Sequence, residues 1–451
     1  MTGRGWLGLL VAALLVGAGA FIWVRAEGSA PTIEGPAELL IGGDKRTVAL
    51  DIADAGSGLS EIRVSVQQAG NEAIVLERVF PGNWRAGGAA PRLPERVEVE
   101  IDPKALGLVH GEAALTVTAR DWSWRNSFRG NETQWQTPIG IDLKKPRIRV
   151  ASGLTYVSRG GSGAVVYTIG EPTVRDGVNV DSVFYRGYPA PGEPESSDRR
   201  FALFAVPADA SKEPRIEVIA EDRAGNVGRS NWPVVLKERV LPRANVTLPT
   251  RFLETKVRQL ADAEGIPLDD LNAAFDRINT ELRASNEAKI AAIVSDSSET
   301  KLWGGAFTQL RNSKVTSRFA EHRSYFVNGE RISEATHYGY DLASTAGAPI
   351  HASNTGRVVF AGELGIYGDC VIIDHGLGLF SLYAHLSSLG VSVGDRVEQS
   401  SELGLSGETG LAGGDHLHFA LIVGGTYVEP LEWWDPVWVR THVEARLGPS
   451  N

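Results

Sequence analysis

The sequence predicts a multidomain, mainly β protein with an N-terminal transmembrane helix, two β-sandwich modules, a helical hairpin and a C-terminal antiparallel β domain. At 451 residues the chain is too long for one ordinary hydrophobic core. Short runs of alternating apolar and polar residues, separated by Gly, Pro and Asp clusters, fill residues 31–240. The pattern turns helical near residue 250 and returns to β from about Trp303. We therefore expect a signal anchor at 1–30, modules at 31–146 and 147–240, a hairpin with its linker at 241–302, the C-terminal domain at 303–440 and a tail at 441–451.

The N-terminus carries an unbroken apolar run from Trp6 to Val24. Its length is close to the roughly 20 residues that cross a bilayer core. A cleaved signal peptide is the rival interpretation, because Ala18-Gly19-Ala20 would make a cleavage site. Since the apolar run continues beyond that site, the sequence favours an uncleaved anchor. The flanking charges differ too little to set the orientation.

Charge and cysteine content exclude several classes of protein. The formal net charge is −10, acidic and basic residues are well mixed and no Lys/Arg block stands out, so we expect no nucleic-acid partner. The single cysteine excludes an intramolecular disulfide. This residue, Cys370, lies in an apolar strand-like run, which favours a buried and inert thiol.

The β region contains a faint internal repeat. Leu115–Asp121 and Ile216–Asp222 each read as a strand that ends in a turn, with Asn126 and Asn226 shortly after. Two copies about a hundred residues apart suggest two sandwich modules. In pattern alone they resemble the immunoglobulin-like domains of bacterial surface proteins, although the Cys…Trp…Cys core signature is absent. We expect them to serve as spacers and docking surfaces.

The segment from about residue 250 to 296 predicts two helices. Thr250 can cap a first helix that stops at Gly265, and Pro267 suits the first turn of a longer one. The longer helix keeps one apolar stripe, formed by Leu271, Phe275, Ile278 and Leu282. This stripe predicts a helical hairpin packed on a neighbouring domain.

The C-terminal segment gathers seven of the nine histidines, at 322, 337, 351, 375, 385, 416 and 418. His416 and His418 are two residues apart, so a strand would point both toward one face. His337 and Asp341 also share a face, on a helix or a strand. His and Asp without a cysteine cluster suit Zn²⁺, and three protein ligands leave one coordination position open, as in catalytic zinc sites. The HExxH helix of many zinc proteases is absent.

The ordered motifs of residues 315–432 resemble those of the M23 zinc endopeptidases of the lysostaphin/LytM type. Besides the histidine motifs, the resemblance includes the following segments: Ser317-Arg-Phe319, Gly347-x-Pro349-Ile, Gly356-Arg-Val-Val, Tyr367-Gly368, Leu382-Tyr-Ala-His385-Leu, Gly394-x-x-Val397 and Gly407-x-Thr-Gly410. A sequence with so many ordered motifs is more specific than an HxH pair alone. The resemblance implies an antiparallel β peptidase domain of LytM type at 303–440.

The resemblance also implies a role for each matched residue. His337, Asp341 and His418 fall on the positions of the zinc ligands, and His385 and His416 on those of the catalytic histidines. All five are present, which argues against the inactive members of the family. The sequence departs from the family at Ala320, where Gly is common, at Asp369, where Asn is common, and in a longer polar insertion, Tyr325–Thr336. We expect His322, His351 and His375 to be surface or structural residues.

These observations predict a membrane-anchored zinc metallo-endopeptidase with one Zn²⁺ ion. Its substrate would be peptide bonds in peptidoglycan stems or cross-links, and its role cell-wall remodelling. The catalytic domain would be exported in the bacterial cell envelope, held at the inner membrane by the N-terminal helix, with a cell-envelope protein partner on the β-modules. Two alternatives stay open: a scaffold that recruits another cell-wall hydrolase, and a peptidase of secreted glycine-rich proteins.

Overall fold

The computed structural model describes residues 3–88, 95–194 and 196–447 and is mainly β, as predicted. The chain divides into two compact units, Met1–Pro146 with Glu221–Val227, and Arg147–Ala220 with Gly228–Asn451. The finer domain boundaries stay a prediction. Residues 1–2 of the predicted anchor and 448–451 of the predicted tail lie outside the described residues.

The first unit begins with helix α1, Gly3–Arg25. Its length is about 34 Å, and its side chains from Trp6 to Val24 are exposed. With a mean hydropathy of 2.4 it is long and apolar enough to cross a membrane, a test that a signal sequence also passes. The helix ends against the β-module, where Arg25 Nη2 donates to Trp122 O at 2.6 Å and Trp124 N donates to Arg25 O at 2.7 Å.

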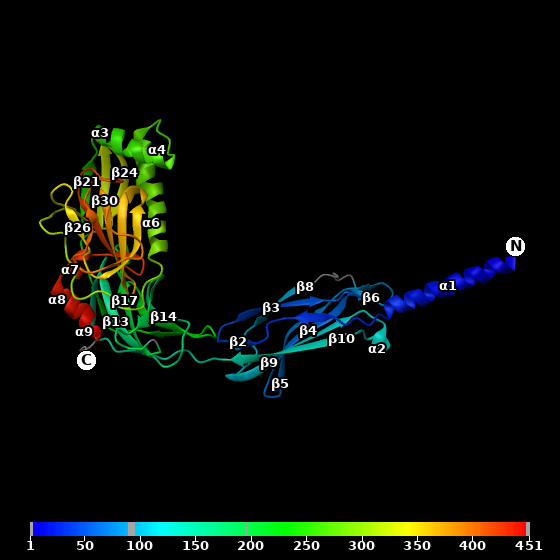
Figure 1. Cartoon of the computed structure of the whole chain (residues 1–451). Helices are drawn as coiled ribbons and strands as arrows, with labels where there is room; N and C mark the ends of the chain where they lie inside the picture. Colours follow the sequence, from blue (N-terminus) through cyan, green and yellow to red (C-terminus); the bar gives the residue numbers. More distant parts are fainter. Residues whose placement is uncertain (1–2, 89–94, 195, 448–451) are drawn as a thin grey trace. The chain divides into compact units, whose positions relative to one another are not determined.

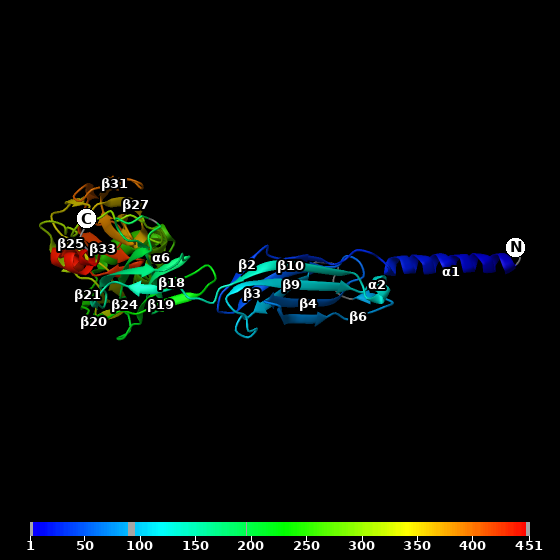
Figure 2. The same ribbon diagram turned by 90° about the horizontal axis from the view of Figure 1, so that it is seen from below.

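Two sheets follow α1 in the same unit. The first sheet has the order β1 (Thr32–Glu34), β3 (Arg46–Ala53), β8 (Glu95–Ile101). The second has the order β2 (Leu39–Ile41), β10 (Glu132–Ile141), β9 (Gly111–Asp121), β4 (Leu59–Gln68), β5 (Asn71–Val79), and Figure 2 shows β10, β9 and β4 side by side. The unit also contains a separate pair of short strands, β6 (Gly82–Asn83) and β7 (Gly87–Gly88), and the short segment α2 (Arg125–Phe128). Alternating residues of both sheets, such as Val97 and Val117, form one core.

The second unit begins with another β region. One sheet has the order β11 (Ile148–Val150), β13 (Ser162–Ile169), β17 (Arg199–Ala205), β16 (Tyr188–Pro189). A second has the order β15 (Val183–Arg186), β14 (Arg175–Val180), β18 (Ile216–Glu221), β19 (Val227–Ser230), and β12 (Thr155–Ser158) pairs with β20 (Val234–Lys237). The core of this region continues into the C-terminal domain, where Trp433 Nε1 donates to Ser162 Oγ at 2.9 Å. The immunoglobulin-like character of both β regions stays a prediction.

Two helical stretches occupy residues 250–293. The first consists of α3 (Thr250–Phe252), the π-helix η1 (Leu253–Val257) and α4 (Arg258–Glu264), and the second of α5 (Leu271–Arg277), the π-helix η2 (Ile278–Leu282) and α6 (Arg283–Ile293). The first ends at Gly265, whose φ of 66° is left-handed, as expected. The predicted helix starts were wrong: Thr250 lies within α3, and the cap of the second stretch is Asp270, whose carboxylate accepts from two backbone N–H groups. The helix starts after the polar cap at Asp270, and Pro267 lies in the preceding loop.

The apolar stripe of the second stretch packs into the C-terminal domain. Phe275, Ile278 and Leu282 are buried in one core with residues of the large sheet, including Ile372 and Phe380. Figure 1 shows α6 running beside the strands of that domain. The stretch is therefore part of the domain's hydrophobic core, while its description as a hairpin stays a prediction.

The C-terminal domain is built on one large antiparallel sheet. Its order is β22 (Lys314–Ser317), β25 (Tyr340–Ala343), β33 (Leu417–Val423), β29 (Leu379–Leu386), β28 (Asp369–Gly376), β27 (Gly356–Glu363), β31 (Arg396–Val397), with β34 (Thr426–Val428) also on β33. Two three-stranded sheets flank it: β21 (Arg243–Thr247), β23 (Glu321–Val327), β24 (Glu330–His337), and β26 (Pro349–His351), β32 (Glu402–Leu405), β30 (Ser388–Leu389). Short helices follow: η3 (Gly365–Tyr367), α7 (Pro430–Trp434), α8 (Pro436–Trp438), η4 (Val439–Glu444) and α9 (Ala445–Leu447).

The polar insertion before the first histidine motif is a β-hairpin. Residues 325–336 lie in β23 and β24, which pair antiparallel and turn at Asn328 and Gly329. Tyr325 and Val327 point into the core beside α5, and the Tyr325 and Phe275 rings are 5.1 Å apart. The hairpin therefore joins the helical stretch to the sheet.

Candidate metal centre

Strands from two sheets bring His337, Asp341 and His418 together. His337 ends β24, Asp341 lies in β25 and His418 in β33. Asp341 and His418 are direct partners across the β25–β33 pair, so their side chains leave the same face of the sheet. All three side chains are buried. His337 and Asp341 do not share the face of one helix or strand that their spacing predicted, because the chain leaves β24 at His337 and enters β25 at Tyr340.

The ligand atoms of the three residues converge on one point. His337 Nε2 lies 2.9 Å from both Asp341 Oδ1 and His418 Nδ1, and these last two atoms are 3.0 Å apart. Atoms that bind one tetrahedral zinc at 2.0–2.1 Å stand about 3.3 Å apart. The triangle is therefore of the size and donor type that fit a zinc ion.

Hydrogen bonds and packing orient both histidines. His337 Nδ1 lies 3.1 Å from Arg318 O, which only accepts, so Nδ1 carries the proton and Nε2 presents its lone pair to the centre. His418 Nε2 is buried without a hydrogen-bond partner among the described residues. The ring lies over Gly339, where a Cβ would come within 2.7 Å of Nε2. Glycine at 339 thus makes room for the ring that turns Nδ1 toward the centre.

Asp341 has a second partner that the sequence did not reveal. Arg323, from β23, donates to Asp341 Oδ2 at 2.9 Å and to Glu321 Oε1 at 2.9 Å. Burial alone would raise the pKa of Asp341, but the adjacent His337, His416 and His418 hold it well below its ordinary value. Asp341 is thus an anion with Oδ2 on Arg323 and Oδ1 at the centre.

His385 and His416 lie beside the triangle. Their ring centroids are 4.8 Å apart, and His416 Nε2 is 3.6 Å from Asp341 Oδ1. Burial lowers the pKa of His385 well below its ordinary value, and the neighbouring His416 and His418 add to this. Burial also acts on His416, but the Asp341 carboxylate outweighs it and raises the pKa of His416.

A β-bulge turns His385 toward the centre. Ala384 pairs with His418 across β29 and β33, so strict alternation would point His385 to the opposite face. The pairing of β28 with β29 shifts between Asp369 and Val371, which leaves Ala384 and His385 opposite one residue. His385 has a φ of 64°, in the left-handed region that few non-glycine residues adopt. Its ring then lies 5.9 Å from that of His418.

Comparison with known proteins identifies the family of the C-terminal domain. The family model "Peptidase family M23" matches residues 335–430, the segment that carries all five of these side chains. The C-terminal domain belongs to peptidase family M23. The match covers about a fifth of the chain, since the N-terminal 334 residues lie outside it.

Named relatives are similar to about a quarter of this chain. The peptidoglycan DD-endopeptidase ShyA of Vibrio cholerae is 36% identical over 119 residues, which are 26% of this chain and 27% of the relative. The DD-carboxypeptidase/endopeptidase Mpg of Neisseria meningitidis is 39% identical over 95 residues, 21% of this chain and 22% of the relative. Among solved structures, the lysostaphin catalytic domain of Staphylococcus simulans is 28% identical, with a TM-score of 0.25, and covers 29% of this chain and 98% of that one. The chain thus spans about a quarter of the length of the curated relatives.

The metal centre of the M23 domain opens into a cavity of about 350 Å³. Its walls include parts that precede the domain's family match: Leu248, Phe252, Phe275, Arg283 and Glu287. Glu287 of α6 accepts hydrogen bonds from the hydroxyl groups of Tyr367, at 2.5 Å, and Tyr427, at 2.7 Å. The helical stretch is therefore a wall of the cleft.

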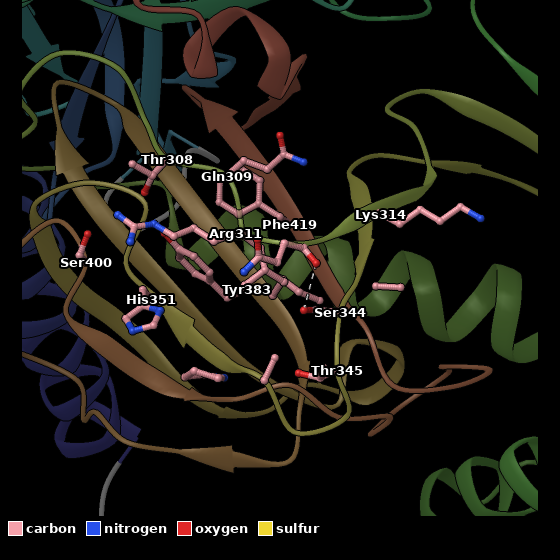
Figure 3. Close-up of a pocket in the computed structure, with 16 residues that line it drawn as sticks. Thr308, Gln309, Arg311, Lys314, Ser344, Thr345, His351, Tyr383, Ser400 and Phe419 are labelled. Carbon is pink, nitrogen blue, oxygen red and sulfur yellow. Dashed lines mark hydrogen bonds between the residues drawn. The ribbon is translucent and has the colours of Figure 1, made fainter.

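A second cavity, of about 670 Å³, lies on the opposite face of the sheet (Figure 3). Leu417 and Phe419 line it and flank His418 in β33, so strand alternation separates this cavity from the metal centre. Tyr383 and His351 also line it, with Arg311 beside them in Figure 3. His351 is exposed here, away from the five clustered residues.

The remaining histidines and the cysteine have structural surroundings. His375 is buried, with Nδ1 2.8 Å from Thr355 O and Nε2 2.7 Å from Ser381 Oγ. His322 is partly exposed and lies 3.7 Å from Glu334. Cys370 is buried, and burial raises the pKa of its thiol, as its apolar context predicted.

Proposed function

We propose that the chain is a membrane-anchored zinc metallo-endopeptidase that hydrolyses peptide bonds in peptidoglycan stem peptides or cross-links. The observation that carries this proposal is the convergence of His337 Nε2, Asp341 Oδ1 and His418 Nδ1 within 3.0 Å of one another inside an M23 domain. The relatives named as peptidoglycan endopeptidases support the substrate class.

His337, Asp341 and His418 would hold one zinc ion. They supply two imidazole nitrogens and one carboxylate oxygen and leave a coordination position open on the cavity side. When bound, zinc supplies Lewis-acid polarisation of a peptide carbonyl and makes water a stronger acid. Arg323 and the Arg318 carbonyl keep the ligands oriented through Asp341 Oδ2 and His337 Nδ1.

His385 and His416 would handle the proton and the developing oxyanion. His385 Nδ1 lies 2.9 Å from Thr409 O, and His416 Nδ1 lies 2.8 Å from Gly414 O. Because carbonyl oxygens only accept, both Nδ1 atoms carry a proton and both Nε2 atoms remain for the reaction. An Nε2 lone pair can take the proton of the attacking water, and an Nε2–H can donate to the oxyanion.

The N-terminal helix would hold the enzyme in the inner membrane, with its M23 domain exported into the cell envelope. A peptidoglycan substrate lies outside the cytoplasm, and α1 is long enough to span the bilayer. The β regions would act as spacers and could bind a cell-envelope protein. With a net charge of −10, tethering supplies the proximity to an anionic wall that electrostatic attraction does not.

The test is mass spectrometry of muropeptides released from isolated sacculi by the zinc-loaded full chain in detergent micelles. We expect new peptide ends with the wild type, none with His418→Ala, and unchanged release with His110→Ala, which alters an exposed histidine of the first unit. Zinc analysis should find one ion per chain and loss of zinc in His337→Ala.

Two outcomes would contradict the proposal in different ways. A zinc-loaded chain that releases no peptide ends from sacculi would favour the scaffold alternative. A chain that cleaves a glycine-rich protein and leaves muropeptides intact would favour the peptidase of secreted proteins.

A further inference from the structure

A buried cluster of three carboxylates lies in the first unit, on residues that take no part in the M23 domain. Glu27 follows α1, Asp54 follows β3, and Asp121 ends β9. One oxygen of each lies within 4.8 Å of the others. Asp54 is 1% exposed, Asp121 is 2% exposed and Glu27 is half-buried. Residues distant in sequence are thus brought together where the chain enters the β-module.

Two oxygens of this cluster are buried without a partner. Asp54 Oδ2 accepts from Gly58 N at 2.5 Å, but Asp54 Oδ1 has no hydrogen-bond partner among the described residues. Glu27 is similar: Oε2 accepts from Ser29 N at 2.7 Å, and the buried Oε1 has none. A buried carboxylate oxygen that gives up water without a new partner costs folding free energy.

Within the described part of the chain, the cluster has no direct ion-pair partner. Among the residues that the structure describes, none of the three carboxylates lies within 4.0 Å of a Lys, Arg or His nitrogen. Burial raises the pKa of both Asp54 and Asp121, and the neighbouring carboxylates raise that of Asp54 further. The structure thus gathers negative charge at a point from which water is largely excluded. A bound cation would offset the folding free energy that burying these carboxylates costs.

Asp121 is held rigidly in this arrangement. Its Oδ1 accepts from Ser123 N at 2.9 Å and from Asn131 N at 2.7 Å, and Oδ2 accepts from Asn131 Nδ2 at 2.8 Å. The same Asn131 amide donates to Glu27 O at 3.1 Å. These bonds orient the carboxylate and fix the backbone of Glu27 beside it. Oδ1 already accepts two hydrogen bonds, whereas Oδ2 accepts one and keeps a lone pair for a further ligand.

We propose that Glu27, Asp54 and Asp121 bind one Ca²⁺ ion. All three donors are carboxylate oxygens, the ligands that hard divalent cations prefer, and neither nitrogen nor sulfur contributes. Oxygens that bind Ca²⁺ at 2.3–2.6 Å stand roughly 3–5 Å apart, which matches the cluster. Ca²⁺ tolerates such irregular spacing, whereas Mg²⁺ demands a near-octahedral shell at 2.0–2.1 Å.

The ion would tie the end of α1 to the β-module. Glu27 is the one ligand from the segment that leaves the helix, and Ser123 Oγ already donates to its carbonyl at 2.7 Å. Gly56 packs against the Glu27 carboxylate, and a Cβ there would come within 2.5 Å of Oε1. Ca²⁺ binding would therefore stiffen the connection between helix and module and stabilise the module.

Terbium luminescence and thermal unfolding of the full chain in detergent micelles, with its zinc retained, test this proposal. Tb³⁺ binds calcium sites and is sensitised by nearby tryptophan, which Trp122 supplies next to Asp121. We expect tryptophan-sensitised Tb³⁺ emission that Ca²⁺ displaces, and a rise in the unfolding temperature with Ca²⁺. Asp54→Asn and Glu27→Gln should each weaken Ca²⁺ binding roughly tenfold or more. Glu100→Gln, an exposed carboxylate of β8, is the matched control and should bind as the wild type does.

In calcium-free buffer, the direction in which a substitution changes stability separates a calcium ligand from a residue with a purely structural role. Because Asp54→Asn removes buried charge at nearly constant shape, we expect this variant to be at least as stable as the wild type in calcium-free buffer. Equal responses of the wild type, Asp54→Asn and Glu27→Gln to Ca²⁺ would overturn the site. An equal stabilisation by Mg²⁺ at the same concentration would overturn the assignment to calcium.

Discussion

At the scale of single residues, several non-glycine positions in the C-terminal domain have left-handed backbone. His385 has a φ of 64°, and Ala320, where the sequence departs from the glycine common in the family, has a φ of 54°. A non-glycine residue in the left-handed region costs on the order of 1 kcal/mol. At His385 the cost is tied to function, because the bulge turns the ring toward His416 and His418.

The His385 backbone leads to a prediction that separates stability from turnover. Asn adopts the left-handed region more readily than other non-glycine residues, so His385→Asn should keep more of the free energy of unfolding than His385→Val does. It should lower kcat by roughly 10²–10⁴-fold, the usual contribution of a proton-transfer residue. His385→Val, β-branched and strained at this φ, should lose stability as well. Urea unfolding and muropeptide release measure the two effects, and an active His385→Asn enzyme would contradict the assigned role.

His375 predicts how stability depends on pH. Burial lowers its pKa from 6.5 to about 4, so the unfolded chain takes up a proton at this residue before the folded chain does. The stability contribution is complete above pH 6.5 and falls as pH decreases toward 4, by about 3 kcal/mol in all. His375→Asn keeps a donor for Thr355 O and does not titrate. Urea unfolding at pH 7, 6 and 5 should show a smaller loss in this variant, and equal losses would refute the assignment.

At the scale of elements, the helical stretch serves both as core and as cleft wall. Phe275 is 1% exposed and packs edge-on against Tyr325 at 5.1 Å, while Arg283 and Glu287 of the same stretch line the cavity. Deleting residues 250–296 would open the core of the M23 domain and could not report on the cleft. Point substitutions are needed to separate the two roles.

The prediction for this stretch is that its apolar stripe stabilises the catalytic domain. Phe275→Ala should lower the free energy of unfolding by about 3–5 kcal/mol, because a large buried ring leaves a cavity. Lys289→Ala, on the exposed side of α6, should change it by less than about 0.5 kcal/mol. Chemical denaturation of the full chain in micelles provides the measurement. Similar values for both variants would show that the stretch is only loosely attached.

Sequence periodicity predicted local features better than long-range ones. The spacing of His416 and His418 was enough to place both on one side, because strand alternation is a local rule. Arg323 reaches Asp341 only because the segment before His337 folds back as a hairpin, and Glu287 reaches Tyr367 only because α6 docks on the sheet. Such contacts depend on tertiary packing, which no local pattern encodes. The bulge at His385 was equally hidden, since nothing in Ala384-His385-Leu386 marks an extra residue.

At the scale of the whole molecule, the proposed activity depends on where the chain is held. The first unit carries α1, and the second carries the M23 domain. A tether raises the effective concentration of an enzyme near its substrate without any new contact. Since the net charge is −10, a tether would bring the proposed peptidase close to an anionic wall that does not attract it electrostatically.

The last prediction tests this tether. Introducing charge at the middle of α1 with Leu10→Arg and Leu14→Arg together should oppose membrane insertion, because each Arg at a helix centre costs about 2.5–3.5 kcal/mol. We expect the wild type and a Leu14→Ile control in the carbonate-washed membrane fraction, with intact masses that include the N-terminal helix, and the double variant displaced from it. A soluble wild-type chain whose mass begins after Ala20 would instead show that the helix is a cleaved signal peptide. The anchor would then be absent, and recruitment to the wall would have to depend on the β regions alone.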